Sequence, residues 1–306
     1  MSILHSSSNI ASEINLNLEA FLKDFSIEVM PRTAAKIENF CEILPQQTLI
    51  YIAHIEGTPI EEMVDTAKRL IEEGFDVMPH FPARIIKNHA TLVDWIKRYQ
   101  NEAGVKQALL LAGGVDKPYG EYQCSMDLLE TGEFDKAGFT NLHVAGHPEG
   151  NIDIDKDGST SNVDAAISWK QTFSKRTDAK MAMTTQFCFE SGPVIEWADR
   201  MTSRGIDIPI HIGVAGPAKL QTMIKFSMAC GVGASLRVLK RRAKDVTKLL
   251  LPFKPNKILT ELAEHKAKNP DFLITNVHFF PLGGIKTNAN WTMENGGKSA
   301  IPAKQS

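Results

Sequence analysis

The chain lacks the features that would place it in several common protein classes. It has four cysteines among 306 residues, far apart and without a CxxC pair: Cys41, Cys124, Cys188 and Cys230. That pattern is typical of a reducing compartment and argues against a zinc site built from cysteines. The formal net charge is only −2, and no long basic stripe is present. We therefore expect no nucleic-acid partner.

Long hydrophobic runs are also missing. No apolar segment approaches the roughly 20 residues that cross a membrane, and the N-terminus has no basic segment followed by an apolar one. With 43% hydrophobic and 23% charged residues, the composition is that of a globular protein. The sequence predicts a cytoplasmic protein that makes no membrane contact.

Several catalytic and binding motifs are absent as well. No GxGxxG follows the first strand candidate, which disfavours a dinucleotide-binding fold. The histidines form no HExxH pair and no cluster with ligand spacing, so we expect no metal site. No serine or cysteine occupies a recognisable nucleophile elbow, which disfavours covalent catalysis by those residues.

What the chain does have is a regular alternation of short apolar segments and longer amphipathic ones. Most of the short segments are apolar on both faces, as in parallel strands covered by helices. They are Phe25–Met30, Thr48–His54, Asp76–Phe81, Gln107–Ala112, Asn141–Gly146, Lys180–Phe187, Asp207–Val214 and Phe272–Phe280. Helix candidates lie between them, at Pro59–Glu73, Ala90–Asn101, Cys124–Thr131, Val163–Lys175, Pro193–Arg204 and Pro217–Ala229, with two more expected within residues 234–265. Eight strands that alternate with helices fit either a closed barrel or a doubly wound sheet, and the missing GxGxxG weakens the second. We therefore expect an α/β fold, a single-domain (β/α)8 TIM barrel.

The two ends of the chain are more polar than the middle. We expect residues 1–20 to form an N-terminal extension, residues 21–284 the catalytic barrel, and residues 285–306 a loose C-terminal tail. Trp291 could pin part of this tail to the barrel.

Unusual polar residues occur toward the ends of the strand candidates. Because a TIM barrel binds its substrate at the C-terminal ends of its strands, we expect these side chains to converge. A lone strand histidine is more often a hydrogen-bonded core residue, so the argument for a site depends on that convergence. A buried acid, a second carboxylate, an amide and histidines suit a bound organic cofactor and one proton transfer. The residues are Glu28, His80, Asp116, His143, His147, Gln186, His211 and His278.

Taken in order, these motifs resemble the methylenetetrahydrofolate reductases. The segment Ile27–Thr33 is similar to the family's FEFFPP-type sequence, and Pro79-His80 matches its PH motif. Gly114-Val115-Asp116 resembles the family's glycine-aspartate, and the HPE and TQF motifs are intact at 147–149 and 185–187. Lys175 lies upstream of TQF, as a lysine does in the family. The similarity covers most of the chain.

The resemblance implies an oxidoreductase that interconverts 5,10-methylenetetrahydrofolate and 5-methyltetrahydrofolate by ping-pong hydride transfer through bound FAD, with NAD(P)H as co-substrate. Glu28 would be the general acid that protonates folate N10, with a pKa raised by partial burial. The substrate-binding residues implied in the same way are Asp116, Gln186 and Phe226, and the flavin contacts are His80, Gly114, Asp116, His147 and Lys175. Core packing would account for Phe226 equally well. Barrels of this family form oligomers, so the resemblance also implies a homo-oligomer.

The chain departs from the family pattern at some of these positions. An extra residue in Ala112–Asp116 leaves the register open, so that Val115 could take the place of the family aspartate. Gly283-Gly284 replaces the Asn-Arg expected after the last strand, which removes a contact to the folate tail. Two alternatives therefore stay open. One is a folate reductase in which hydride passes directly from nicotinamide without flavin, and the other is a folate-dependent methyltransferase-type barrel without hydride transfer.

Overall fold

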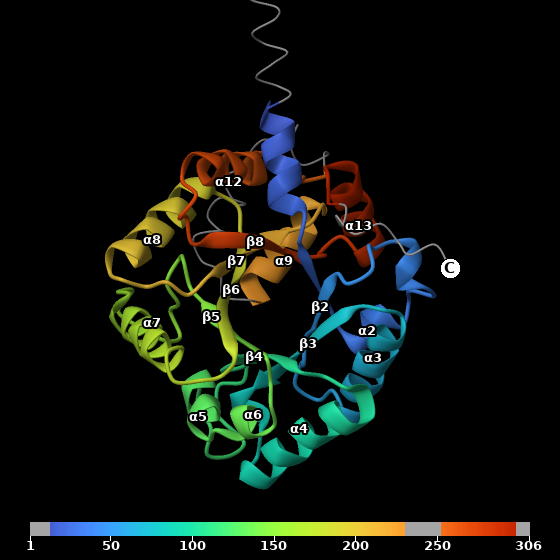
Figure 1. The fold of residues 1–306 in the computed structure, drawn as a ribbon, viewed down its shortest axis with the longest axis vertical. Helices are drawn as coiled ribbons and strands as arrows, with labels where there is room; N and C mark the ends of the chain where they lie inside the picture. The colour runs from blue at the N-terminus through green and yellow to red at the C-terminus, as the bar shows by residue number, and fades with distance from the viewer. Residues whose placement is uncertain (1–12, 230–251, 298–306) are drawn as a thin grey trace, which may run out of the picture.

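The computed structural model describes residues 13–229 and 252–297, which form a closed parallel barrel surrounded by helices (Figure 1). The strands pair in sequence order, and β1 pairs with β8 to close the ring. The predicted TIM-barrel fold is confirmed, and each strand overlaps the segment predicted for it. The strands are β1 (Ser26–Val29), β2 (Leu49–Ile52), β3 (Asp76–Pro82), β4 (Gln107–Leu111), β5 (Asn141–Gly146), β6 (Lys180–Cys188), β7 (Ile210–Ala215) and β8 (Ile274–Phe280).

Helices follow the strands and cover the outside of the barrel (Figure 1). They are α2 (Pro31–Ala34), α3 (Ile60–Glu72), α4 (His89–Ala103), α5 (Ser125–Glu130), α6 (Glu133–Lys136), α7 (Ser161–Phe173), α8 (Ser191–Ser203), α9 (Leu220–Ala229), α12 (Asn256–Lys268) and α13 (Ile285–Glu294), with short 3-10 helices at Phe40–Glu42 and Ala83–Ile85. None of those in the described part is both long and apolar enough to cross a membrane. Of the two helices expected within 234–265, most of the first lies outside the described residues.

Described residues at both ends of the chain pack into the main core, which corrects the expectation of a loose C-terminal tail. Residues 13–22 are helical, and Leu18, Phe21 and Leu22 are buried in the main hydrophobic core. The segment expected to be a loose tail begins with α13, whose Ile285 and Trp291 are also buried in that core. Trp291 contacts Phe279 of β8 edge to face, with the ring centroids 5.9 Å apart, so it does pin this segment to the barrel. The polar residues of α13 lie on both faces, since Lys286, Thr287 and Asn290 are exposed whereas Asn288 and Thr292 are buried.

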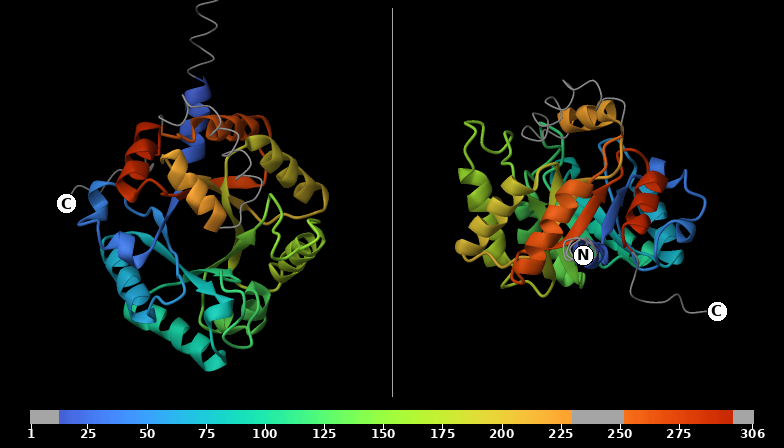
Figure 2. Two further views of the ribbon diagram at one scale, coloured as in Figure 1. Left: turned by 180° about the vertical axis from the view of Figure 1, so that it is seen from behind. Right: turned by 90° about the horizontal axis from the view of Figure 1, so that it is seen from above.

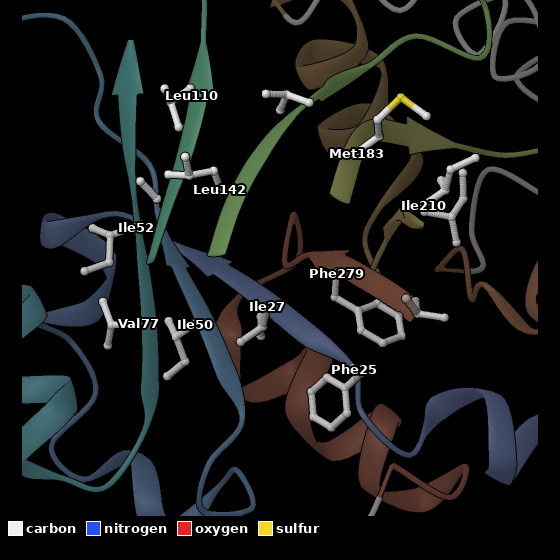
Figure 3. Packing of buried hydrophobic residues seen from close by; sticks show 14 of the residues in the cluster. Phe25, Ile27, Ile50, Ile52, Val77, Leu110, Leu142, Met183, Ile210 and Phe279 are labelled. Atoms are coloured by element: carbon white, nitrogen blue, oxygen red, sulfur yellow. The ribbon is translucent and has the colours of Figure 1, made fainter. Parts of the chain in front are cut away.

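Alternation along each strand divides the side chains between two environments, because successive residues of a strand point to opposite faces. The outward set is apolar and packs beneath the helices (Figure 3). It includes Phe25 just before β1 and, from the strands, Ile27, Ile50, Ile52, Val77, Leu110, Leu142, Met183, Ile210 and Phe279. Burial of this set is the main source of stability, since each large apolar side chain contributes roughly 1.5–3 kcal/mol. The inward set is therefore free to carry polar residues.

We call the end of the barrel where the strands have their C-termini the mouth. An irregularity in β6 changes which side chains are exposed there. The pairing of β6 with β7 shifts between Thr184 and Phe187, as at a β-bulge. Gly213 of β7 permits this, because a Cβ there would lie 2.3 Å from the Thr185 carbonyl oxygen. Gln186 is exposed at this point, between buried Thr185 and Phe187. The glycine thus allows a polar side chain to face solvent within a central strand.

We predict that Gly213→Ala destabilises the protein by about 1–3 kcal/mol or more, because the added methyl group meets backbone atoms that cannot move aside. The measurement is the free energy of unfolding from urea denaturation. Gly192→Ala is the matched control, since a Cβ at Gly192 meets nothing within 4 Å. Equal stability of the two variants would contradict the role given to Gly213.

Candidate active site

The inside of the barrel is unusually polar. TIM-barrel interiors are typically filled by layers of branched aliphatic side chains. Here an apolar cluster of Tyr51, Met78 and Leu109 lies inside the barrel beside a group of polar and titratable residues. A buried polar group is costly unless it has a partner, so such a group needs a structural or functional reason. Its members are Ser26, Glu28, His80, His143, Thr184, His211 and His278, with the Tyr51 hydroxyl.

Glu28 of β1 lies between two imidazoles. Its Oε2 atom is 3.3 Å from Nε2 of His80 on β3 and 3.8 Å from Nε2 of His278 on β8. Neither Nε2 atom has a hydrogen-bond partner of good geometry in the described part of the chain. The other ring nitrogen of His278, Nδ1, shares a 2.9 Å hydrogen bond with the Ser26 hydroxyl. The first strand, the third and the eighth therefore converge on one carboxylate, as the sequence predicted.

The charge state of Glu28 differs from the expected one. Burial raises the pKa of this carboxyl group, but the neighbouring imidazoles of His278 and His80 outweigh burial and lower the pKa to about 2. Burial also lowers the pKa of His278, an effect that Glu28 partly opposes. The expectation of a raised pKa considered burial alone and is wrong for the site as it stands. Glu28 is a carboxylate at neutral pH, and a proton entering this cluster would reside on an imidazole.

A second polar group lies next to the first. The Tyr51 hydroxyl and His143 Nδ1 form a 2.6 Å hydrogen bond, and Thr184 Oγ1 is 3.2 Å from the same hydroxyl. The ring of His211 contacts that of His143 edge to face, with centroids 4.6 Å apart. Burial lowers the pKa of His143 well below its usual value and that of His211 to about 4. Both histidines are therefore neutral at physiological pH.

Other residues singled out in the sequence lie at the mouth. Gln186 is exposed near the C-terminal end of β6, and Gly114 and Asp116 are exposed on the loop after β4. His147 follows β5, where burial and the nearby Lys170 lower its pKa to about 4. Phe226 on α9 is 36% exposed, so it is not a core residue. In the right-hand view of Figure 2, α9 stands beyond one end of the barrel.

The loop after β4 is held by Arg84, which lies in the connection between β3 and α4. Arg84 donates from Nη1 to the Val115 carbonyl oxygen and from Nε to that of Gln123, each at 3.1 Å. Val115 is half-buried, whereas Asp116 is exposed. Of the two residues left open by the sequence, Asp116 is the one whose side chain is available at the mouth.

Lys175 does not lie with this group. It follows α7, which runs from the end of β5 back to the start of β6, so Lys175 is at the opposite end of the barrel from the mouth. The lysine that reaches the mouth side is Lys170, which is 5% exposed and donates from Nζ to the Ala145 carbonyl oxygen at 2.8 Å. Burial lowers its pKa to about 8. Helical spacing from Val163 and Ile167 could have indicated that Lys170 is on the buried face.

One side of the mouth is apolar. Phe187 and Phe189 at the end of β6 pack with Phe253 and with Met223 of α9, and Phe280 of β8 packs against them. Gly283 allows the loop after β8 to approach this wall, since a Cβ there would lie 2.0 Å from the Pro217 carbonyl oxygen. Exposed hydrophobic side chains also occur on loops after other strands and on α9: Ile55, Tyr119, Ile152, Ile154, Phe226 and Met228. Among the described residues, no set of three or more His, Cys, Asp or Glu has an arrangement that could hold a metal ion.

Comparisons with known proteins identify no family for this chain. No family model matches the chain. One similar solved structure is a protein of Streptomyces coelicolor assigned as chitinase A, with 12% identity and a TM-score of 0.38, covering 90% of this chain and 96% of that one. Another, from Anabaena variabilis and assigned as a sugar phosphate isomerase/epimerase, has 10% identity and a TM-score of 0.28, covering 92% and 91%. Likeness at this level carries no argument about substrates.

The buried histidines predict a loss of stability in mild acid. A histidine whose pKa is lowered by folding binds fewer protons in the folded state, so stability falls as pH drops from 6.5 toward the folded pKa. With folded values of about 4, His147 and His211 would each contribute a loss on the order of 3 kcal/mol across that window. Urea denaturation at pH 7, 6, 5 and 4 measures it.

The variant His211→Asn provides the check on this origin. It should show a shallower decline in the free energy of unfolding between pH 6.5 and 4, because one buried imidazole no longer has to be kept neutral. His265→Gln is the control, since His265 lies outside the barrel against Phe272. An unchanged slope in His211→Asn would show that other groups cause the acid sensitivity.

Proposed function

We propose that the protein is an oxidoreductase that interconverts 5,10-methylenetetrahydrofolate and 5-methyltetrahydrofolate by hydride transfer, with FAD and NAD(P)H. The observation that carries this proposal is Glu28 held between His80 and His278 inside the barrel. Reduction of the methylene bridge requires a proton on folate N10, which turns that nitrogen into a leaving group and produces a cation. A partly buried carboxylate with adjoining imidazoles suits both steps.

The cluster would deliver the proton as a unit. An imidazolium at His278 is stabilised by the adjacent Glu28 carboxylate, which opposes the effect of burial on the pKa of this histidine. Because the Glu28 side chain is 20% exposed, it is the member of the cluster that a ligand in the mouth can approach. Glu28 would relay a proton from the adjoining imidazolium to N10, which leaves that imidazole neutral, and the Glu28 carboxylate would then face the cationic product and stabilise it.

The mouth has the properties that a pterin ring needs. Gln186 offers an amide and Asp116 a carboxylate for the N–H groups of a 2-amino-4-oxo ring. Phe226 and the apolar wall around Phe187 offer surfaces for a flat ring. Nicotinamide is also flat and carries an amide, so Gln186 and Phe226 could serve both substrates in turn, as ping-pong turnover requires.

The residues near β5 fit the flavin cofactor. A diphosphate needs cationic partners, and the buried Lys170 ammonium next to His147 provides one at the mouth end of that strand. Gly114 on the neighbouring loop presents no side chain, and a Cβ there would meet nothing within 4 Å. When bound and reduced by NAD(P)H, the flavin would supply the hydride and return to its oxidised form. His80, which the resemblance assigns to flavin, also faces Glu28 and so belongs to the proton-transfer cluster.

A flavin-free reductase is the second candidate, favoured by the position of Lys175 at the far end of the barrel. The absorbance spectrum of the purified protein separates the two. We expect the yellow absorbance of oxidised flavin, bleached by NADH or NADPH and restored by 5,10-methylenetetrahydrofolate. A colourless protein that still oxidises nicotinamide with this folate, with no gain on addition of FAD, would favour the second candidate. No nicotinamide-dependent turnover at all would leave the methyltransferase-type barrel.

Glu28→Gln tests the acid. We expect flavin content and reduction by NAD(P)H to be retained and folate turnover to fall by about 10²–10⁴-fold, because the leaving nitrogen no longer receives its proton. Glu133→Gln is the matched control, since Glu133 also lies 3.3 Å from a histidine, His89, but on an outer helix. Near-normal folate turnover in Glu28→Gln would refute the assignment.

A further inference from the structure

Tyr51 is a residue of the barrel interior to which the proposed reaction assigns no role. It is fully buried on β2, directly opposite Glu28 in the pairing of β1 with β2. Its ring centroid lies 4.3 Å from that of His278 and 6.4 Å from that of His80. The same tyrosine therefore packs against both imidazoles that adjoin Glu28.

The ring of Tyr51 is anchored by its hydroxyl group. His143 Nδ1 is 2.6 Å from the hydroxyl oxygen and Thr184 Oγ1 is 3.2 Å from it, so strands β5 and β6 hold it from the far side. His211 of β7 supports His143 through an edge-to-face ring contact. A hydroxyl bound to two partners in a closed interior has one orientation, and that orientation fixes the plane of the ring.

Tyr51 is unsuited to donate a proton itself, because burial raises the pKa of its hydroxyl far above the usual value. What its ring does is exclude water. Burial is the largest cause of the lowered pKa of His278, and the ring of Tyr51 covers that imidazole at close range. The titratable groups around it are Glu28 from β1, His80 from β3, His143 from β5, His211 from β7 and His278 from β8.

We propose that Tyr51 is a positioning residue, anchored by His143 and Thr184, that holds His278 and His80 against Glu28 and keeps water from them. It thereby sets the pH range over which the cluster can hold and release its proton. The link to catalysis rests on the proposed reductase function, whereas the effect on the imidazoles does not. The two can therefore be tested separately.

The first measurement needs no enzymatic activity. Histidine titrations are followed by NMR in the full-length protein, with the His278 signal assigned by its loss in His278→Gln. We expect Tyr51→Leu to move the titration of His278 upward by about one pH unit, because water reaches the imidazole. Tyr51→Phe keeps the ring and loses the anchor, so a smaller shift in the same direction is expected. If Tyr51→Leu does not fold, Tyr51→Phe decides the question.

The control for lost packing is Tyr99→Leu. Tyr99 is also fully buried, but it lies on α4 outside the barrel, packed against Phe81 with ring centroids 5.3 Å apart. Its substitution should lower the melting temperature to a similar extent and leave the His278 titration at its wild-type position. If Tyr99→Leu shifts the His278 titration as much as Tyr51→Leu does, any loss of core packing would explain the shift, and the proposal would be overturned.

The second measurement is the pH profile of folate turnover. In Tyr51→Leu the limb that reports the proton-donating cluster should move to higher pH together with the His278 titration, with KM less affected than kcat. Unchanged titration and profile in folded Tyr51 variants would refute the positioning role. If the wild-type protein shows no folate turnover, the proposed function fails, and the NMR titration alone still decides whether Tyr51 controls the imidazoles.

Discussion

Glu28 is a carboxylate inside a closed barrel, and the two imidazoles at 3.3 and 3.8 Å make that arrangement stable. An isolated buried carboxylate would be expelled or neutralised, because desolvation disfavours its charged form. His80 and His278 reverse that preference. Burial lowers the pKa of His278 and the Glu28 carboxylate opposes that effect, so burial and charge are balanced against each other in this cluster. The proposed chemistry and the role of Tyr51 both follow from this balance.

Apolar packing between the strands and the surrounding helices offsets the free-energy cost of a polar barrel interior. All the large apolar residues that stabilise the barrel from outside, such as Ile50, Leu142 and Ile210, point away from the site. The interior can therefore exchange aliphatic layers for imidazoles without loss of the main source of stability. Neutral His143 and His211 complete this interior. Because burial lowers the pKa of both, the stability of the folded protein depends on a pH at which they stay uncharged.

Strand positions were predictable because apolar residues on both faces leave few alternatives, and β5 matches its predicted bounds at both ends. The convergence of Glu28, His80 and His278 followed from the fold alone. The charge state of Glu28 did not, because it depends on the distances to two residues that are far away in the sequence. Motif order points to Lys175, whereas the buried face of α7 contains Lys170. The Tyr51–His143 bond joins strands whose register the sequence does not specify.

The site also depends on both ends of the chain. Ser26 and His278 are 252 residues apart and meet where β1 pairs with β8, along a seam of two residue pairs, Ser26 with His278 and Ile27 with Phe279. A nascent chain on the ribosome that has not yet released β8 cannot close the ring or bring His278 to Glu28. Barrel closure and assembly of the carboxylate with both imidazoles are thus the same event. A chain that ends before β8 would leave the Glu28 carboxylate without one of the two imidazoles beside it.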